Sequence, residues 1–230
     1  MTEAPASAFK GFQPAATRFF KDLAANQDRV WFAAHKAEHE EFVKAPMGAL
    51  VQAVTARLAA TALPLTGDPK RSLFRIQRDV RFSADKSPYK TNAGAVLSRD
   101  GSKTSPGELY FQFGAGDILA AAGFYMPTPD DLALLRAGMA RDVEGWLSLR
   151  RGLEQQGLTL ITAGALKRVP KGFEAAPALI HDDLRLKSWA VSRPVALRIA
   201  RSAELVEAIA GLALSCADLL EFGWTALDAA

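Results

Sequence analysis

Apolar residues in the first quarter of the chain recur every three or four positions, which is the spacing of a helix with one buried face. Residues 14–25 follow this period, and Pro14 suits the first turn of a helix. Residues 27–60 follow it again, with Pro46 placed where it predicts a kink or a restart. We therefore predict helices over both stretches, ended by the turn-rich sequence TALPLTGDP at residues 61–69.

The period changes after residue 70, where apolar and polar side chains begin to alternate. Alternation places successive side chains on opposite faces of a strand, so it indicates a sheet with one buried face. Asp100-Gly101 and the glycines at 114 and 116 supply turn residues between the alternating runs. We predict an antiparallel sheet of at most four strands here, over residues 74–82, 93–97, 109–113 and 118–126.

Helical signals return at Thr128, which can cap a helix whose first turn holds Pro129 and two acidic residues. The predicted elements of this half are a helix to about residue 140, a helix over residues 143–156 closed by Gly157, one or two strands within residues 158–195, and a final apolar helix from a Ser202 cap to about Phe222.

Helices, then strands, then helices predict an α+β fold with a central antiparallel sheet. The chain has 230 residues, of which 49% are hydrophobic, and this is enough for a sizeable core. One domain spanning residues 1–230 is predicted, with residues 1–10 flexible. Cys216, the only cysteine of the sequence, lies in an apolar stretch and is predicted to be a buried small hydrophobic residue.

The cellular location is predicted from three absences in the sequence. The start, MTEAPASAFKGF, lacks the long apolar core of a signal peptide. No later stretch approaches the roughly 18 uninterrupted apolar residues of a membrane span. A single cysteine gives no disulfide framework and suits a reducing compartment. These features predict a cytoplasmic protein with no membrane contact.

Positive charge is concentrated in one stretch, although the net charge of the whole chain is only +3. Residues 70–90 hold seven cations and two carboxylates, so they carry +5 and the rest of the chain carries −2. Concentrated charge indicates an anionic partner. The charged residues of this stretch are Lys70, Arg71, Arg75, Arg78, Asp79, Arg81, Asp85, Lys86 and Lys90.

The candidate site is RIQRDVRFSADKSPYKT, residues 75–91. If residues 74–82 form a strand, Arg78 falls on its apolar side and needs an anionic partner, and Phe82 faces the same side. Asp79, crowded by cations, is expected to stay ionised; it could orient an arginine, act as a catalytic base or hold a metal. The candidate ligand-binding residues are Arg75, Arg78, Arg81, Lys86, Tyr89, Lys90 and Thr91.

Guanidinium groups match the oxygens of phosphate and carboxylate, and lysine, tyrosine and threonine side chains add charge and hydrogen bonds. The motif therefore predicts binding of a phosphate-bearing ligand, either a small molecule or a nucleic-acid backbone, and one version is an enzyme that acts on phosphate esters. No P-loop, dinucleotide fingerprint or nucleophile elbow occurs, so the sequence indicates neither a reaction nor a cofactor.

The alternative is an interaction or scaffold protein. In that case Asp79, Asp85 and carboxylates of the first helices neutralise the arginines as a structural salt-bridge network, or the motif docks an acidic protein partner. Both readings are compatible with the same residues, because ion-pair networks and binding sites use the same side chains.

The sequence HKAEH, residues 35–39, has the inverted zincin pattern, in which two histidines lie one helical turn apart beside a glutamate. A zinc site needs a third protein ligand, and the only other histidine is His181. We predict instead that His35 and His39 lie on the solvated face of a charged helix, and no metal site is predicted.

The motif R-x-x-R-D-x-R-F-x-x-x-K-x-P-Y-K-T resembles the signature of an uncharacterised, mainly bacterial family, domain of unknown function 2461. The matching residues are Arg75, Arg78, Asp79, Arg81, Phe82, Lys86, Pro88, Tyr89, Lys90 and Thr91. Trp31-Phe32, Pro170-Lys171-Gly172 and Lys187-Ser188 are also similar, so the resemblance spans nearly the whole chain. It implies no activity. It associates positions 35 and 39 with asparagine and tyrosine, which argues further against zinc.

Overall fold

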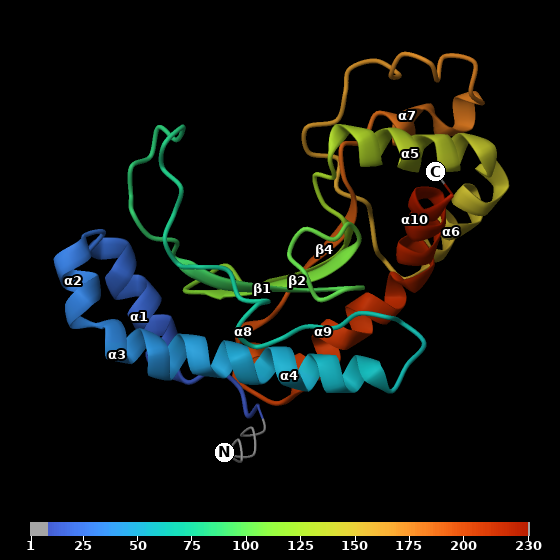
Figure 1. Ribbon diagram of the computed structural model, residues 1–230. Helices are drawn as coiled ribbons and strands as arrows, with labels where there is room; N and C mark the ends of the chain where they lie inside the picture. Colours follow the sequence, from blue (N-terminus) through green and yellow to red (C-terminus); the bar gives the residue numbers. More distant parts are fainter. Residues whose placement is uncertain (1–8, 230) are drawn as a thin grey trace. The chain divides into compact units, whose positions relative to one another are not determined.

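The computed structural model of the chain describes residues 9–229 and shows helices, then a sheet, then helices (Figure 1). The predicted α+β class is confirmed. The sheet is antiparallel, with its strands in the order β1-β2-β3-β4. The strands are β1 (Asn92–Ser98), β2 (Glu108–Gly114), β3 (Leu119–Phe124) and β4 (Trp189–Pro194).

Three of the four predicted strands are confirmed as β1, β2 and β3, and β4 lies in the mixed segment that was predicted to add strands. In β2, Leu109, Phe111 and Phe113 are buried, whereas the residues between them are partly exposed. This is the alternation that the sequence shows, and it arises because one face of the strand meets the core.

The fourth predicted strand, residues 74–82, is wrong. Leu73, just before the segment, forms a bridge with Ala95 of β1, and the N–H of Phe74 donates to the carbonyl of Gly94 at 2.9 Å; the chain then leaves the sheet. Phe82, expected on an apolar face, is 96% exposed. Alternation alone was misleading here, because local side-chain hydrogen bonds close residues 79–87 into a loop and compete with the hydrogen bonds of a strand.

The first helices are α1 (Pro14–Ala25), α2 (Arg29–Ala34), α3 (Lys36–His39), the π-turn η1 (Glu40–Lys44) and α4 (Ala45–Ala59). The predicted helix over residues 14–25 is confirmed. The predicted disturbance at Pro46 is confirmed as η1, which ends just before that residue. Proline cannot donate to the preceding turn, and a wider turn accommodates it.

The later helices are α5 (Pro129–Arg141), α6 (Val143–Gln155), the short turn η2 (Ala178–Ile180), α7 (His181–Leu184), α8 (Leu197–Ala200), α9 (Glu204–Ser215) and α10 (Ala217–Asp228). Thr128 caps α5 as predicted, since its hydroxyl accepts the backbone N–H of Asp131 at 3.1 Å. The predicted single final helix is wrong: it divides at Cys216, whose backbone leaves helical geometry, and it continues beyond Phe222.

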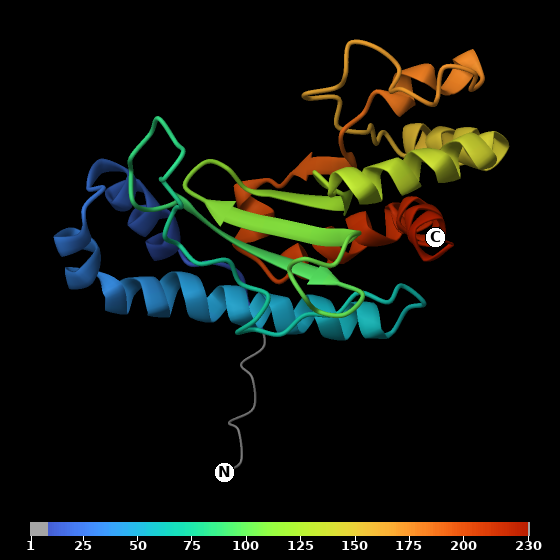
Figure 2. The same ribbon diagram turned by 45° about the horizontal axis from the view of Figure 1, so that its top comes forward.

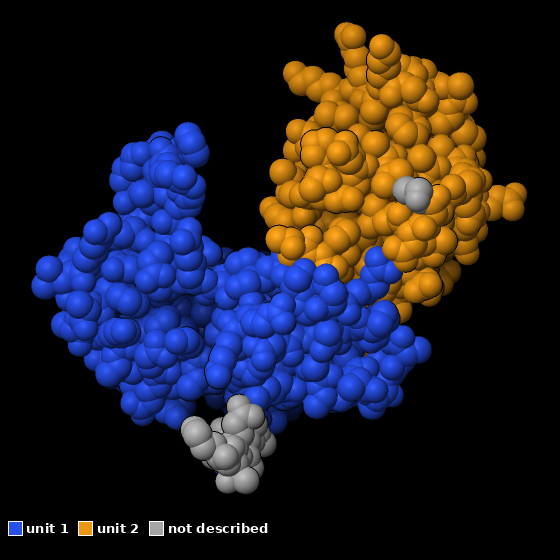
Figure 3. Space-filling model, viewed as in Figure 1, with its two compact units in different colours: residues 1–103, 110–120, 194–211 blue, residues 104–109, 121–193, 212–230 orange. Residues whose placement is uncertain are grey.

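Contacts between residues divide the chain into two units, each built from several stretches (Figure 3). Unit 1 comprises residues 1–103, 110–120 and 194–211, and unit 2 comprises residues 104–109, 121–193 and 212–230. The chain passes between the units repeatedly, so no single position divides it. The predicted flexible start, residues 1–10, falls mainly on residues 1–8, which lie outside the described residues; Phe9 is buried against Phe12.

In unit 1, α4 packs against β1 and runs along the sheet (Figure 2). Buried side chains of α1 and α4, among them Phe20, Leu50 and Val54, form much of its core. In unit 2, α5 and α10 pack together, and Trp146 and Trp189 are fully buried with ring centroids 4.3 Å apart. The candidate motif lies in unit 1.

Two further predictions concern exposure. Cys216 is fully buried as predicted, and burial raises the pKa of its thiol to about 12, so the thiol stays protonated. Among the described residues, none of the helices combines the length and the apolar composition that crossing a membrane requires.

Candidate anion-binding site

The backbone of the candidate motif doubles back on itself. Residues 76–78 pair with residues 88–90: Gln77 and Tyr89 form a bridge, and the N–H of Arg78 donates to the carbonyl of Pro88 at 2.9 Å. This stem supports a loop, residues 79–87, that projects beside α2 (Figure 1). The side chain of Gln27 stabilises the stem, since its Oε1 accepts the N–H of Tyr89 at 3.1 Å.

Charged side chains in the loop are largely paired within it. Arg81 donates to both carboxylate oxygens of Asp79, at 2.9 and 2.6 Å, and Arg78 forms an ion pair with Asp85. The ammonium of Lys86 donates to the carbonyl of Val80 at 2.9 Å. Arg78 therefore has the anionic partner that the sequence demanded, and Arg81 and Lys86 hold the loop together.

Both carboxylates of the loop are held ionised. Hydrogen bonds from the side chain and the backbone of Arg81 lower the pKa of Asp79, and the charge of Arg75 lowers it further. Hydrogen bonds from Ser87 and Arg78 lower the pKa of Asp85. The expectation that Asp79 stays ionised is thus met, and a carboxylate occupied by Arg81 is a weak base.

The other predicted residues lie at the stem. Tyr89 is buried, and its ring stacks on Phe32 of α2 at a centroid distance of 4.4 Å. Thr91 is exposed and lines a cavity of about 360 Å³ whose wall also includes the paired Arg78 and Asp85. Tyr89 therefore anchors the stem, whereas the hydroxyl of Thr91 remains accessible.

A different environment surrounds Arg75 and Lys90. The ammonium of Lys90 lies 5.4 Å from the ring centroid of Phe74, and so does the ammonium of Lys103, which follows β1. Lys103 is further fixed by a 2.7 Å hydrogen bond from its Nζ to the carbonyl of Leu73. We call Arg75, Lys90 and Lys103 the cationic cluster. Cation–π attraction and this hydrogen bond hold its two lysines in place.

The cationic cluster lacks counter-ions. Within residues 9–229, no ion pair involves Arg75, Lys90 or Lys103. Partial burial lowers the pKa of Lys90, and the charges of Arg75 and Lys103 lower it further. The three cations therefore repel one another, and an anion placed among them would relieve that repulsion.

A cavity of about 230 Å³ opens beside the cluster, and we call it the small cavity. Its lining residues are Phe74, Arg75, Lys90, Asn92, Gly94, Tyr110 and Gln112. Gly94 leaves room for the side chain of Tyr110, since a Cβ atom at residue 94 would lie 2.6 Å from the hydroxyl of Tyr110. That hydroxyl donates to Gln112 at 2.7 Å. The small cavity thus combines two cations with the side-chain amide of Asn92, whereas the amide nitrogen of Gln112 is engaged in hydrogen bonds to Asp117.

Four polar residues of this site were missed from the sequence: Lys103, Asn92, Tyr110 and Gln112. They belong to β1, β2 and the connection between them, so only the pairing of these strands brings them to residues 74–75. No signal within the motif indicates them. Alternation in β2 does place Tyr110 and Gln112 together on the face opposite its buried side chains.

The two histidines of HKAEH are packed against aromatic rings. His35 stacks on Trp31 at a centroid distance of 4.0 Å, and His39 lies 5.5 Å from the ring centroids of both Phe19 and Phe32. Burial lowers the pKa of His39. The prediction of a solvated face therefore holds only in part, because both histidines are partly exposed while aromatic rings of α1 and α2 pack against them.

Comparison of the chain with known protein families identifies one family. A family model described as a conserved hypothetical protein (DUF2461) matches residues 15–222. The chain belongs to the DUF2461 family. No curated protein and no solved structure matches the chain. The part of the chain that belongs to DUF2461 includes the whole motif and the cationic cluster.

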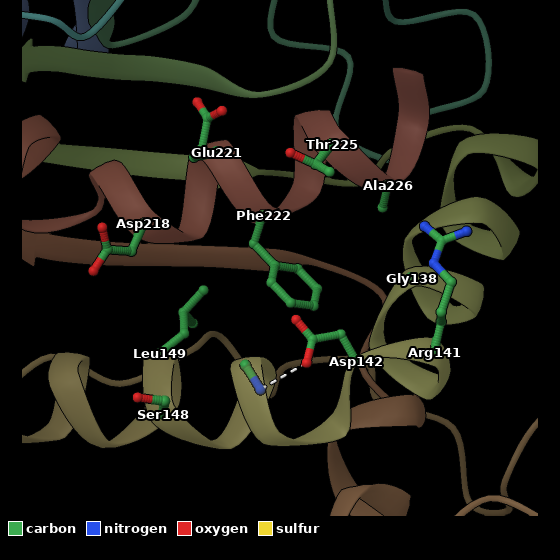
Figure 4. A pocket seen from close by; sticks show the side chains of 11 residues that line it. Gly138, Arg141, Asp142, Ser148, Leu149, Asp218, Glu221, Phe222, Thr225 and Ala226 are labelled. Atoms are coloured by element: carbon green, nitrogen blue, oxygen red, sulfur yellow. Dashed lines mark hydrogen bonds between the residues drawn. The ribbon is translucent and has the colours of Figure 1, made fainter. Parts of the chain in front are cut away.

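Unit 2 of this DUF2461 chain has a cavity of its own, of about 550 Å³, between α6 and α10 (Figure 4). Phe222 extends from α10 towards α6, and Asp218 and Glu221 lie on the same helix. Asp142 is engaged in capping α6, since it accepts the N–H of Gly145 at 2.9 Å. Among the described residues, no group of three or more His, Cys, Asp or Glu side chains could hold a metal.

Proposed function

We propose that the protein binds a phosphate-bearing ligand, with its phosphate held by the cationic cluster. The observation that carries the proposal is the absence of any carboxylate paired with Arg75, Lys90 or Lys103 within residues 9–229, although other cations of the motif are paired. Arg75 and Lys103 are exposed and Lys90 is half-buried, so an anion can reach these cations, and like charges gathered at one place attract it.

The chemistry of the walls supports phosphate as the bound group. The guanidinium of Arg75 can donate two parallel hydrogen bonds to phosphate oxygens, and the lysines contribute charge. Asn92 adds an amide group at the small cavity, where the amide nitrogen of Gln112 is already engaged with Asp117. Ligand pockets are typically on the order of 300–1,000 Å³. A cavity of about 230 Å³ is therefore suited to one group of a ligand.

One version of the proposal is an enzyme that acts on phosphate esters. In that version Asp79 is the candidate for the catalytic residue, and the charge of Arg75 connects it to the cluster. Its lowered pKa favours a role in orienting Arg81 over a role as a base. Asp79 is not among the residues that line the small cavity. Binding is therefore the activity that the arrangement supports best.

The second candidate is an architectural role for the loop, residues 79–87. The ion pairs of Arg78 with Asp85 and of Arg81 with Asp79 favour it. On this view the loop serves an interaction or scaffold protein, and its exposed Phe82 and Arg81 meet an acidic protein partner. The two candidates use different halves of the motif, so variants can separate them.

The test is the melting temperature of Arg75→Gln, Lys90→Gln and Lys103→Gln with and without inorganic phosphate. In the wild type, phosphate at about 100 times its Kd should stabilise by about 2.7 kcal/mol. In chains of this size each kcal/mol raises the melting temperature by roughly 2–4 °C. The three variants should melt at or slightly above the wild-type temperature without phosphate, because repulsion is relieved, and should lose the phosphate effect.

Lys171→Gln, which removes an exposed charge in unit 2, is the control and should keep the phosphate effect. If the three site variants instead melt far below the wild type, and phosphate has no effect on the wild type, the cluster is architectural and the proposal fails.

The phosphate could belong to a small molecule or to a nucleic-acid backbone, and binding of these two ligands depends differently on the salt concentration. If a single-stranded nucleic acid binds, log K should fall by roughly 0.7 per contacted phosphate for each unit of log salt. A titration of a short oligonucleotide at several salt concentrations measures that slope. Absent or salt-independent binding would leave a small molecule as the source of the phosphate.

A further inference from the structure

A second cavity adjoins the cationic cluster, and its walls have a different character. It has a volume of about 550 Å³, and we call it the large cavity. Apolar side chains form much of its wall: Phe32, Val43, Leu73, Ile76 and Ala93. Val43 and Phe32 come from η1 and α2, Leu73 lies just before the motif, Ile76 belongs to the motif, and Ala93 belongs to β1. Side chains from the first helices and from residues 73–93 thus form an apolar surface beside the cationic cluster.

The small and large cavities meet. Phe74, Arg75 and Gly94 line both of them, and Lys103 lines the large cavity. A group bound in the small cavity is therefore close to the apolar wall of the large one.

Charged side chains also line the large cavity. Lys44 is paired with Glu40, and Lys36 and Lys70 add further positive charge. A cavity lined by apolar side chains and by an excess of positive charge is complementary to a ligand that is apolar at one end and anionic at the other. A free phosphate ion leaves the large cavity unused. A nucleic-acid backbone presents phosphates in a row, whereas the ammonium groups of Lys90 and Lys103 both lie 5.4 Å from the ring centroid of one residue, Phe74.

We infer that the ligand is a small organic phosphate whose aromatic or aliphatic group occupies the large cavity. The inference rests on the proposed function, because the phosphate is assigned to the cationic cluster. The phosphate lies in the small cavity, and the carbon-rich group lies against Leu73, Ile76 and Phe32. A volume of about 550 Å³ is in the range of pockets for ligands of drug or nucleotide size.

The experiment compares 1-naphthyl phosphate with inorganic phosphate by calorimetry on the full chain. The wild type should bind 1-naphthyl phosphate at least about tenfold more tightly, because burial of the ring adds to the attraction of the phosphate. Ala93→Leu fills the large cavity and should abolish the tenfold preference while leaving the affinity for inorganic phosphate unchanged. Ala84→Leu, the same change at an exposed residue of the loop, should keep the preference.

A second variant covers the case in which Ala93→Leu fails to fold. Leu73→Ala shortens a side chain of the wall, so it removes apolar surface from the large cavity without filling the cavity. It should reduce the preference for 1-naphthyl phosphate by several fold. Both variants are compared with the wild type by circular dichroism before binding is measured.

The outcomes separate this inference from the proposed function. If both compounds bind equally and Arg75→Gln abolishes both, the phosphate site stands and the organic-phosphate inference is overturned. If neither compound binds, the proposed function falls as well. If a single-stranded oligonucleotide binds more tightly than 1-naphthyl phosphate and Ala93→Leu leaves it unaffected, the ligand is a nucleic acid and the inference is again overturned.

Discussion

Arg75 and Arg81 are six positions apart in one motif, yet their surroundings give them different roles. Arg81 is 76% exposed and donates to both oxygens of Asp79. Arg75 has no ion pair within residues 9–229 and lines the small and large cavities. An exposed pair such as that of Arg81 contributes little to stability. An unpaired arginine beside two lysines is available to an anion.

At the residue scale, Glu108 at the start of β2 is expected to make stability depend on pH. Burial raises the pKa of its carboxyl from about 4.5 to about 7, against hydrogen bonds from the N–H groups of Tyr125 and Gly107 that lower it. Between those two values the folded chain keeps a proton that the unfolded chain has lost. The free energy of unfolding should therefore fall as the pH rises through this window.

Glu108→Gln removes the titration and keeps an oxygen that can accept both hydrogen bonds. The variant should be more stable than the wild type at pH 8, on the order of 2 kcal/mol after discounting for the water that reaches the carboxyl. At pH 4.5, where the wild-type carboxyl holds its proton, the two should be about equal. Urea unfolding at several pH values measures the difference. A difference that does not change with pH would contradict the assignment.

At the element scale, α6 and α7 are joined through one buried carboxylate. Asp183 of α7 accepts the indole N–H of Trp146 at 2.7 Å and also pairs with Arg150, and both of these residues lie on α6. The side chain of Asp183 is only 5% exposed, whereas Glu154, the other partner of Arg150, is 52% exposed. The two acidic residues share a partner but differ in burial.

Asp183→Ala should lower the free energy of unfolding by roughly 2–4 kcal/mol, because it leaves the buried indole N–H without an acceptor and removes a carboxylate from Arg150. Glu154→Ala removes the exposed partner of the same arginine and should change stability by less than about 0.5 kcal/mol. Chemical denaturation of both variants provides the comparison. Equal losses of unfolding free energy in the two variants would show that the buried contacts of Asp183 stabilise the protein no more than the exposed ion pair of Glu154.

At the scale of the whole molecule, residues from both ends of the chain build unit 1. The N–H of Phe12 donates to the carbonyl of Ala200 at 2.9 Å, and the ring of Phe12 stacks on Phe113 at 4.0 Å. Gly11 makes this approach possible: its φ is +105°, and a Cβ atom there would lie 2.3 Å from the carbonyl carbon of Arg201. The missing side chain of Gly11 thus lets the backbone of Arg201, far away in the sequence, pack directly against it.

Gly11→Ala should therefore destabilise unit 1 on the order of 3 kcal/mol, because backbone strain and a clash with Arg201 add together. Gly172→Ala is the matched control, since Gly172 has a φ of +92° but nothing within 4 Å of a Cβ atom. It should cost about 1 kcal/mol from strain alone. The difference between the two melting temperatures isolates the close approach. Similar losses in both variants would count against it.

The sequence by itself determined those features that depend on neighbouring residues. The α+β class, the helix over residues 14–25, the cap at Thr128 and the alternating strand β2 follow from local periodicity and capping, which act over a few positions. The location of the motif and the burial of Cys216 were also readable from composition. Each of these features depends on residues within one short stretch of the chain, so the sequence of that stretch is enough to predict it.

Only the tertiary structure decided which cations of the motif are paired. The sequence placed Arg75, Arg78 and Arg81 together and left open whether they form a site or a network. The fold divides them, because the loop supplies carboxylates to Arg78 and Arg81, whereas Arg75 lines the large cavity together with Lys103, a residue outside the motif. Ion pairing depends on distances of a few ångströms between side chains, and strand pairing sets those distances between residues far apart in sequence.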